Sequence, residues 1–440
     1  MTPTRCLFHA LWLALWVTTP PATAIADAAA NLQAEPGHAF PGALGWAAQT
    51  PGGRGGRILR VTTLAPTGPG SLLEALEARG PRIVVFEVGG VIDLDRRSVR
   101  IEQPFLTIAG QTAPSPGVTL VRGGLDVATH DVIIQHVRVR PGEAGAAKGS
   151  GLEIDAISTV GGARDVIVDH CSLTWATDEN LSASGPRFEG NDPEAWRAAT
   201  SHRITFSNNI IAEGLARATH SKGEHSKGSL IHDNVTEILI VGNLYAHNME
   251  RSPLFKGGVR GAVINNLIYD PGPKAVHYNL IAEEWGAHPY QLGQLTLIGN
   301  VLRAGPSTPP DVALLTLGGS GDLEVYAADN IAIDRLGRPL PAEGLYTAAA
   351  ASIRHVEKPP TMPAGLEPLA AVEVQDVVIR HAGARPWDRD AIDRRIVADT
   401  IEARGEIIDS EQAVGGYPVQ QVTRQKFDPA AWDLRFMTRK

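Results

Sequence analysis

The sequence predicts an all-β fold, a right-handed parallel β-helix (solenoid) with short helical caps and loop insertions. Three observations predict it: short strand-like runs recur through the middle of the chain, each run carries a marked residue at the same phase, and helical periodicity is absent there. β-Branched residues favour strands, and strands of fixed phase separated by variable insertions are typical of a solenoid.

Seven runs share one pattern, a β-branched alternating segment followed by a polar or small pair and a further apolar pair. They are "DVIIQHVRVR", "DVIVDHCSLTW", "RITFSNNIIAEG", "EILIVGNLYAHN", "GAVINNLIYD", "QLTLIGNVLRAG" and "DLEVYAADNIAID". At the matching position stand His136, Cys171, Asn209, Asn243, Asn266, Asn300 and Asn330. Stacked coils would align the asparagines so that their amides hydrogen-bond along the axis, and Asn also tolerates a left-handed turn. A β-sandwich, the alternative, would space its strands by about 8–12 residues.

The chain divides into three predicted parts. Residues 1–24, "MTPTRCLFHALWLALWVTTPPATA", join one Arg, an apolar run too short to span a membrane and an Ala-Thr-Ala end, which predicts a secretory signal. The protein is therefore expected to be secreted, to the periplasm or the exterior. Removal of the signal takes Cys6 with it and leaves Cys171 alone, so the mature chain would form no intramolecular disulfide and would depend on its core or on metals.

Residues 25–335 are expected to form the β-helix domain, and residues 336–440 a C-terminal extension that packs on the solenoid. Residues 37–80 contain Gly-rich turns and one short helix-like run, and "RPWDRDAIDRRIVADTIEARG" has Asp/Arg pairs at helical spacing. We expect both flanks to cap the ends of the solenoid.

The charge balance excludes one class of partner. The formal net charge is −8 over 440 residues, and the chain has no run of Lys or Arg that could follow a phosphate backbone. The chain is therefore not expected to bind nucleic acid. No membrane partner is expected either, and the protein is expected to be a monomer. An acidic protein that binds a polyanion needs local cations or bound metal ions.

Three acids are candidates for such a metal site. Glu153 and Asp155 are two residues apart and point the same way on a strand, while Asp178 follows the strand of the next coil. Coils stack about 4.8 Å apart, so the three carboxylates can converge. They would repel one another unless a hard cation lay between them, and oxygen ligands of this kind suit Ca²⁺. A solvated acidic face is the competing interpretation.

Two clusters of cations follow neighbouring coils. "HSKGEHSKGSL" carries Lys222 and Lys227, and "ERSPLFKGG" carries Arg251 and Lys256, so the clusters should be neighbours on one face. A basic patch that neutralises nearby acids is the alternative.

Two histidines in the first of these segments suggest another metal. His220 and His225 are five residues apart in a Gly-rich stretch, and the sequence offers no obvious third ligand. A zinc site at this position is therefore not favoured.

Several segments resemble the pectate lyases, polysaccharide lyase family 1, between about residues 38 and 335. They are "AFPGALGWAAQTPGGRGG", "TIAGQTAPSPG", "VIVDHCSLTWATDENLS", "HSKGSL" and "NLYAHNMERSPLFKGG", together with the Asn coils. "AGARPWDRDAIDRRIV" also resembles a tail of secreted bacterial members. The resemblance implies an enzyme, a carbon–oxygen lyase that cleaves polygalacturonate (pectate) by calcium-assisted β-elimination and leaves 4,5-unsaturated oligogalacturonides.

The most specific match is Arg-x-Pro-x-x-Arg/Lys-Gly-Gly after a His-Asn-containing strand, present here at residues 251–258. The resemblance implies that Arg251 takes the proton and that Lys227 and Lys256 hold the substrate. It also assigns the calcium site to Glu153, Asp155 and Asp178.

The chain departs from the family pattern at two positions. Lys256 stands where arginine is usual, and Ser182 stands where a fourth calcium acid is usual. Glu179 could replace that acid if its side chain turned across.

The chemistry explains the need for cations. The C5 proton of galacturonate is α to a carboxylate, so its removal creates a dianionic enolate that cations stabilise. Guanidinium normally stays protonated, and neighbouring positive charge makes its neutral form accessible, so activity should rise in alkali.

Three other functions stay open. A glycoside hydrolase would recruit two of Asp165, Asp169 and Asp178 but would leave Arg251 and Lys256 without a role. A pectin lyase or other uronide lyase that acts on methylated substrate would not need the three acids of the predicted calcium site. A non-catalytic polysaccharide-binding β-helix is kept open by the two departures from the family pattern.

Overall fold

A computed structural model describes residues 37–225, 227–346 and 350–440. The secretory signal expected at residues 1–24, including Cys6, lies outside the described residues. Within the described ranges, no helix has both the length and the apolar character needed to cross a membrane.

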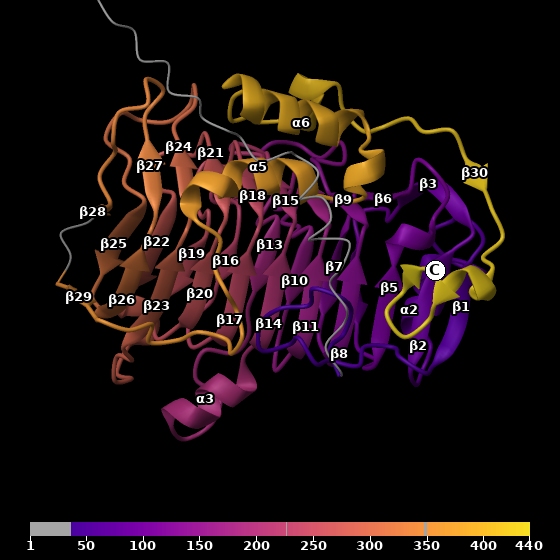
Figure 1. Ribbon diagram of the computed structural model, residues 1–440, viewed down its shortest axis with the longest axis horizontal. Coiled ribbons are helices and arrows are strands. Elements are labelled where there is room, and N and C mark those ends of the chain that lie inside the picture. The colour runs from indigo at the N-terminus through magenta and orange to yellow at the C-terminus, as the bar shows by residue number, and fades with distance from the viewer. Residues whose placement is uncertain (1–36, 226, 347–349) are drawn as a thin grey trace, which may run out of the picture.

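Three long sheets form the body of the molecule, and each complete coil contributes one strand to each sheet (Figure 1). The first sheet contains β1 (Arg57–Val61), β2 (Arg82–Phe86), β5 (Leu106–Ala109), β8 (His130–Gln135), β11 (Arg164–Asp169), β14 (His202–Ser207), β17 (Thr236–Val241), β20 (Arg260–Ile264), β23 (Gly293–Ile298), β26 (Leu323–Ala328) and β29 (Ile353–His355). The second contains β3 (Val88–Asp93), β6 (Val118–Val121), β9 (Arg138–Arg140), β12 (Ser172–Thr174), β15 (Ile210–Ala212), β18 (Leu244–Ala246), β21 (Leu267–Tyr269), β24 (Val301–Arg303), β27 (Ile331–Ile333) and, at its edge, β30 (Thr423–Arg424).

The third sheet contains β4 (Ser98–Ile101), β7 (Gly124–Val127), β10 (Ile157–Thr159), β13 (Leu181–Ala183), β16 (Leu230–Ile231), β19 (Leu254–Lys256), β22 (Val276–Leu280), β25 (Leu315–Gly319) and β28 (Glu343–Leu345). Successive coils pair in parallel, as Val166 of β11 does with Ile204 of β14, whereas β30 pairs antiparallel with β3. The parallel β-helix that the sequence predicts is therefore confirmed.

Side chains point alternately inward and outward along each strand, and the inward ones fill the interior of the coils. In the first sheet, Val132, Val166, Ile204 and Ile238 occupy equivalent positions in register and are all fully buried in one apolar core. That core runs from Val61 to Val325, so each coil is held by the coils on either side of it.

The predicted asparagine ladder is present. Its first member is Cys171, whose buried backbone N–H donates to Oδ1 of Asn209 at 2.8 Å. The side-chain amides then connect Asn209 to Asn243 at 2.9 Å, Asn243 to Asn266 at 2.9 Å, and so on through Asn300 to Asn330. The prediction that Cys171 is buried beside Asn209 and in line with Asn243 is confirmed.

One position in the predicted ladder is wrong by a residue. His136 stacks on the ring of His170, with centroids 5.0 Å apart, so Val137 and not His136 lies in line with Cys171. The first member of each pair adopts the left-handed turn, as at His136 (φ 56°) and Asn208 (φ 54°), while the second forms the ladder. In each pair, therefore, the first residue makes the turn and the second lies in line with the ladder.

The N-terminal flank covers one end of the solenoid only in part. Phe40 and its neighbours pack instead on the outer face of the first sheet, against Ile133 and Ile167. Helix α2 (Leu72–Glu77) begins at Ser71, whose side chain accepts from the Glu74 backbone, and it buries Leu72 and Leu76 in the main core. Two further short helices, α3 (Pro193–Ala199) and α4 (Ala282–Trp285), are insertions between strands. Four 3-10 turns are η1 (Gly110–Thr112), η2 (Pro386–Asp388), η3 (Glu411–Val414) and η4 (Pro429–Ala431), and a final hairpin joins β31 (Trp432–Asp433) to β32 (Thr438–Arg439).

The C-terminal helices do not lie over the end of the solenoid, where a cap was expected. Helices α5 (Ala371–His381) and α6 (Ala391–Glu402) lie along its side (Figure 1). The cause is an apolar outer surface on the second sheet: Ile210, Leu244 and Leu267 pack there against apolar residues of both helices, including Val374 and Ile396.

Buried ion pairs fix α6 to the second sheet. Nη2 of Arg140 lies 2.7 Å from Oδ1 of Asp393, and Nε of Arg138 lies 3.1 Å from Oδ2 of the same aspartate. Asp390 pairs with Nη1 of Arg140 at 2.6 Å. Both arginines are fully buried, so Asp390 and Asp393 hold the helix on the sheet. A pair at helical spacing, as the sequence predicts, is formed along α6 by Arg395 and Asp399, whose Nη1 and Oδ2 atoms are 3.4 Å apart.

Candidate active site

The candidate residues gather on the turns that lead from the second sheet into the third. Backbone hydrogen bonds align these turns: the N–H of Lys227 donates to the carbonyl of Asp178 at 2.9 Å, and that of Gly228 to the carbonyl of Glu250 at 3.1 Å. Lys227 also forms a parallel bridge with Glu179. The stacking of coils therefore brings residues distant in sequence into one group.

Three carboxylates form one part of this group. One oxygen each from Asp155, Asp178 and Glu179 lies within 4.8 Å of the other two. Burial and the neighbouring Asp178 raise the pKa of Asp155 to about 7, and burial raises the pKa of Glu179 well above its usual range. We call these three residues the acid group. Its mutual repulsion is what a bound cation would relieve.

The acid group differs from the predicted calcium set by one residue. Glu179 lies with Asp155 and Asp178, and its N–H donates to Oδ1 of Asp155 at 2.9 Å. Glu153 accepts instead from the backbone N–H of Ser221 at 3.2 Å, and its Oε1 lies 3.3 Å from Nδ1 of His220. Glu179 thus lies beside Asp155 and Asp178, although Ser182 stands where the family pattern has a fourth acid.

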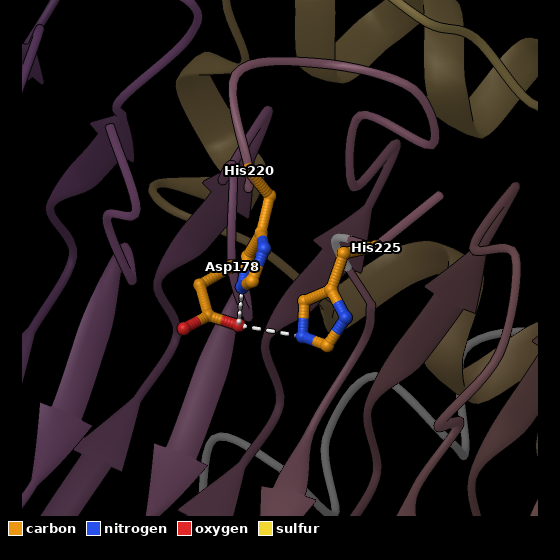
Figure 2. A group of neighbouring side chains, drawn as sticks. All are labelled: Asp178, His220 and His225. Carbon is orange, nitrogen blue, oxygen red and sulfur yellow. Dashed lines mark ion pairs between the residues drawn. The ribbon is translucent and has the colours of Figure 1, made fainter. Parts of the chain in front are cut away.

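Two histidines reach the acid group from a different loop. His220 and His225 lie between β15 and β16, and both direct Nε2 toward Oδ1 of Asp178, at 3.6 and 2.9 Å (Figure 2). Burial and the neighbouring His225 lower the pKa of His220. Although burial opposes it, hydrogen bonding with His225 holds the pKa of Asp178 below its usual value. The sequence did not show that Asp178 lies opposite both rings.

Arg251 and Lys227 lie on the adjoining turns. Arg251 has a left-handed backbone (φ 62°), and its Nη1 donates to Oε1 of Glu179, so it contacts the acid group directly. The Lys227 side chain is buried, and its Nζ lies 3.7 Å from Oε2 of Glu250. Burial lowers the pKa of Lys227. Oε1 of Glu250 in turn lies 2.7 Å from Nζ of Lys274.

Lys256 is directed to a different carboxylate. It lies on β19, and its Nζ donates to Oε2 of Glu284 on α4. Nη2 of Arg187 donates to the same oxygen at 2.9 Å. Each of the three predicted cations therefore already faces a protein carboxylate. Glu284 was missed because α4 is an insertion outside the repeat.

One further residue of the site was also missed. His277 on β22 lies next to Leu254 of β19, is almost fully buried, and has no hydrogen-bond partner at either ring nitrogen among the described residues. Burial, together with the charges of Lys274, Arg251, Lys227 and Lys256, lowers its pKa well below the usual range. A neutral imidazole therefore adjoins the cations. Its place one coil after the Arg251 segment was the available signal.

Comparison with known proteins gives the family. No family model matches the chain. It is 34% identical over 385 residues to a protein of Aspergillus terreus named "Probable pectate lyase C", covering 86% of this chain and 81% of that protein. A protein of the same name from Neosartorya fischeri is 32% identical over 383 residues, with the same two coverages of 86% and 81%.

Solved structures agree on the fold alone. The cedar pollen allergen jun a 1 matches with a TM-score of 0.52 and 15% identity over 78% of this chain and 92% of that one. A pectate lyase bound to hexasaccharide matches with a TM-score of 0.51 and 14% identity, over 80% and 99%. The curated relatives establish more than the fold: the chain belongs to the pectate lyase family, whose members are lyases that act on polysaccharides, as the motifs of the sequence predict.

Proposed function

We propose that this chain cleaves polygalacturonate by calcium-assisted β-elimination and leaves 4,5-unsaturated oligogalacturonides. The observation that carries the proposal is the contact of Arg251 with Glu179, which joins the predicted base to the acid group. The names of the curated relatives, and the hexasaccharide named for one structural neighbour, support a polysaccharide substrate.

The acid group fits a calcium ion. Its three carboxylates supply only oxygen ligands, and Asp155 and Glu179 are held together in a buried setting that raises their pKa values. Asp155, Asp178 and Glu179 would hold the ion. When bound, calcium would add positive charge close to the substrate carboxylate, where the enolate charge develops.

The side chains of the chain divide the remaining work. Arg251 accepts the C5 proton, the C5–H electron pair forms the double bond between C4 and C5, and the C4–O bond breaks. The leaving oxygen takes a proton from solvent and departs as a hydroxyl. The guanidinium must first give up a proton, and its contact with Glu179 must be released so that it can reach C5.

Lys227 and Lys256 hold substrate carboxylates in this scheme. Both are largely buried, so their exchange of a protein carboxylate for a substrate carboxylate takes place with little competition from water. Glu250 and Glu284 are the partners that the substrate displaces.

We also propose that the protein is secreted. The signal-like pattern of residues 1–24 supports this location, because a polymeric substrate must be reached outside the cell.

One assay tests the reaction. The full chain is incubated with polygalacturonate and calcium, and the ultraviolet absorbance of the conjugated double bond is followed. We expect that absorbance to rise, to disappear with excess chelator and to return with calcium. New reducing ends without the absorbance would mean hydrolysis and would reject the lyase proposal. Full activity in chelator, with a preference for methylated polymer, would favour a pectin lyase instead.

A further inference from the structure

Two imidazoles and one carboxylate converge beside the acid group. One ligand atom each from Asp178, His220 and His225 lies within 4.8 Å of the other two. The two rings are 3.9 Å apart between centroids, and both histidines are buried (Figure 2). The histidines come from the insertion between β15 and β16, whereas Asp178 comes from the turn between β12 and β13.

The spacing of these atoms matches a small tetrahedral ion. Bonds of about 2.0–2.1 Å to imidazole nitrogen and carboxylate oxygen place two ligand atoms about 3.3 Å apart in a tetrahedral site. Oδ1 of Asp178 lies 2.9 Å from Nε2 of His225 and 3.6 Å from Nε2 of His220, on either side of that value. Small movements of side chains would therefore complete the geometry.

The ligand types select the ion. Calcium takes oxygen ligands, whereas imidazole suits zinc and its transition-metal neighbours. We propose that Asp178, His220 and His225 form a second metal site, for one ion of the Zn²⁺ type, which shares Asp178 with the acid group. Three protein ligands leave one tetrahedral position open.

Glu153 is placed to orient one of the ligands. Oε1 of Glu153 lies 3.3 Å from Nδ1 of His220, which also accepts from the backbone N–H of Lys222 at 3.1 Å. A metal at Nε2 puts the ring proton on Nδ1, which then gives up the hydrogen bond from Lys222 and donates one to the Glu153 carboxylate. Glu153, predicted from the sequence as a calcium ligand, becomes a positioning residue for His220.

The shared aspartate links the two sites. An ion of the Zn²⁺ type bound by Asp178 reduces the share of that carboxylate left for calcium, so zinc should slow the calcium-assisted reaction. This effect on rate rests on the proposed function, whereas the binding of the metal does not.

Direct metal binding tests the site without substrate. The full chain, free of any affinity tag and stripped with chelator, is titrated with Co²⁺ and its visible absorption is recorded. We expect one Co²⁺ per chain, bands typical of tetrahedral coordination, and their loss when Zn²⁺ is added. His220→Gln and His225→Gln should each weaken binding at least about tenfold, and Glu153→Gln should do so by about 10–100-fold.

His130→Gln is the matched control. The His130 ring also contacts a carboxylate, Oδ2 of Asp131 at 2.8 Å, but packs against Phe105 rather than a second imidazole. It should bind Co²⁺ as the unaltered protein does. Circular dichroism of each variant checks folding, and Asp178→Asn, which keeps both rings, should also lose the cobalt bands.

The outcomes separate this site from the proposed reaction. Lyase activity without uptake of Co²⁺ or Zn²⁺ would reject only the second metal site. Uptake that the His220 and His225 variants do not change would place the ion elsewhere and also reject it. Stoichiometric uptake without any ultraviolet-absorbing product would leave the metal site standing and reject the lyase.

Discussion

Arg251 and Glu179 form an ion pair across two coils of the solenoid, with the guanidinium donating to a carboxylate that also belongs to the acid group. The contact joins the two halves of the candidate site through a single side chain. A change in the contacts of Glu179 with Asp155 and Asp178 therefore also changes its contact with Arg251.

Replacement of Arg251 separates a base from a simple charge. Arg251→Ala should lose about 10²–10⁴ in turnover while polymer binding persists. Arg251→Lys should not restore turnover, because an ammonium cannot occupy the place of the guanidinium. Lys256→Ala should instead raise KM, since Lys256 contacts the ground-state carboxylate. Steady-state kinetics of the three variants measure this, and a reversed pattern for Arg251 and Lys256 would exchange their roles.

Glu179→Gln tests the composition of the acid group. The amide keeps the shape but removes one anionic ligand, so the calcium concentration that gives half-maximal rate should rise. Glu250→Gln is the control, because Glu250 contacts Lys227 and Lys274 rather than the acid group. An unaltered calcium requirement in Glu179→Gln would remove Glu179 from the calcium site.

Asp393→Ala tests the attachment of α6. It leaves Arg138 and Arg140 buried without one of their carboxylates, which should lower the free energy of unfolding by about 3–5 kcal/mol. Glu402→Ala, at an exposed position near the end of the same helix, should change it by less than about 0.5 kcal/mol. Urea unfolding followed by circular dichroism compares the two, and equal losses would contradict the structural role of the pair.

His136 should make stability depend on pH. Burial and the neighbouring His170 lower its pKa from 6.5 to about 3, so between these values the unfolded chain binds a proton that the folded chain does not. The free energy of unfolding should therefore fall as the pH drops below about 6.5, by up to about 1.4 kcal/mol per pH unit from this group.

His136→Asn should remove that part of the slope, because Asn208 shows that asparagine accepts the same left-handed turn. Urea unfolding at several pH values measures the slope, with His355→Asn on the exposed surface as control. A slope that His136→Asn leaves unchanged would assign the pH dependence to other groups.

The β-helix was predictable because the asparagines recur at the same position in successive coils. The asparagine amides must align along one axis, so their positions in the sequence fix the stacking of the coils. The error at His136 arose because the in-line position of this coil holds the apolar Val137, while the polar residue beside it, His136, makes the turn. The lateral position of α5 and α6 was not predictable, because it depends on the outward-facing residues of strands far earlier in the chain, such as Ile210.

The candidate site was predictable where it follows the stacking. Asp155, Asp178, Lys227 and Arg251 lie on successive turns, and the coil spacing brings them together. The partners supplied by insertions were not predictable in the same way. His220 and His225 meet Asp178 only because the loop before β16 folds back over an earlier turn. The repeating sequence pattern does not indicate the course of that loop.

The asparagine ladder also shows which parts of the chain can vary in length. Its links span 38, 34, 23, 34 and 30 residues, yet each is closed by the same kind of hydrogen bond, from a backbone N–H to an asparagine Oδ1. The loops of a coil can therefore be longer or shorter without disturbing the neighbouring coils, provided that an asparagine occupies the ladder position. Most of the candidate site lies on the connecting turns, away from the ladder, so changes in those turns can alter the site while the stacking of the coils is kept.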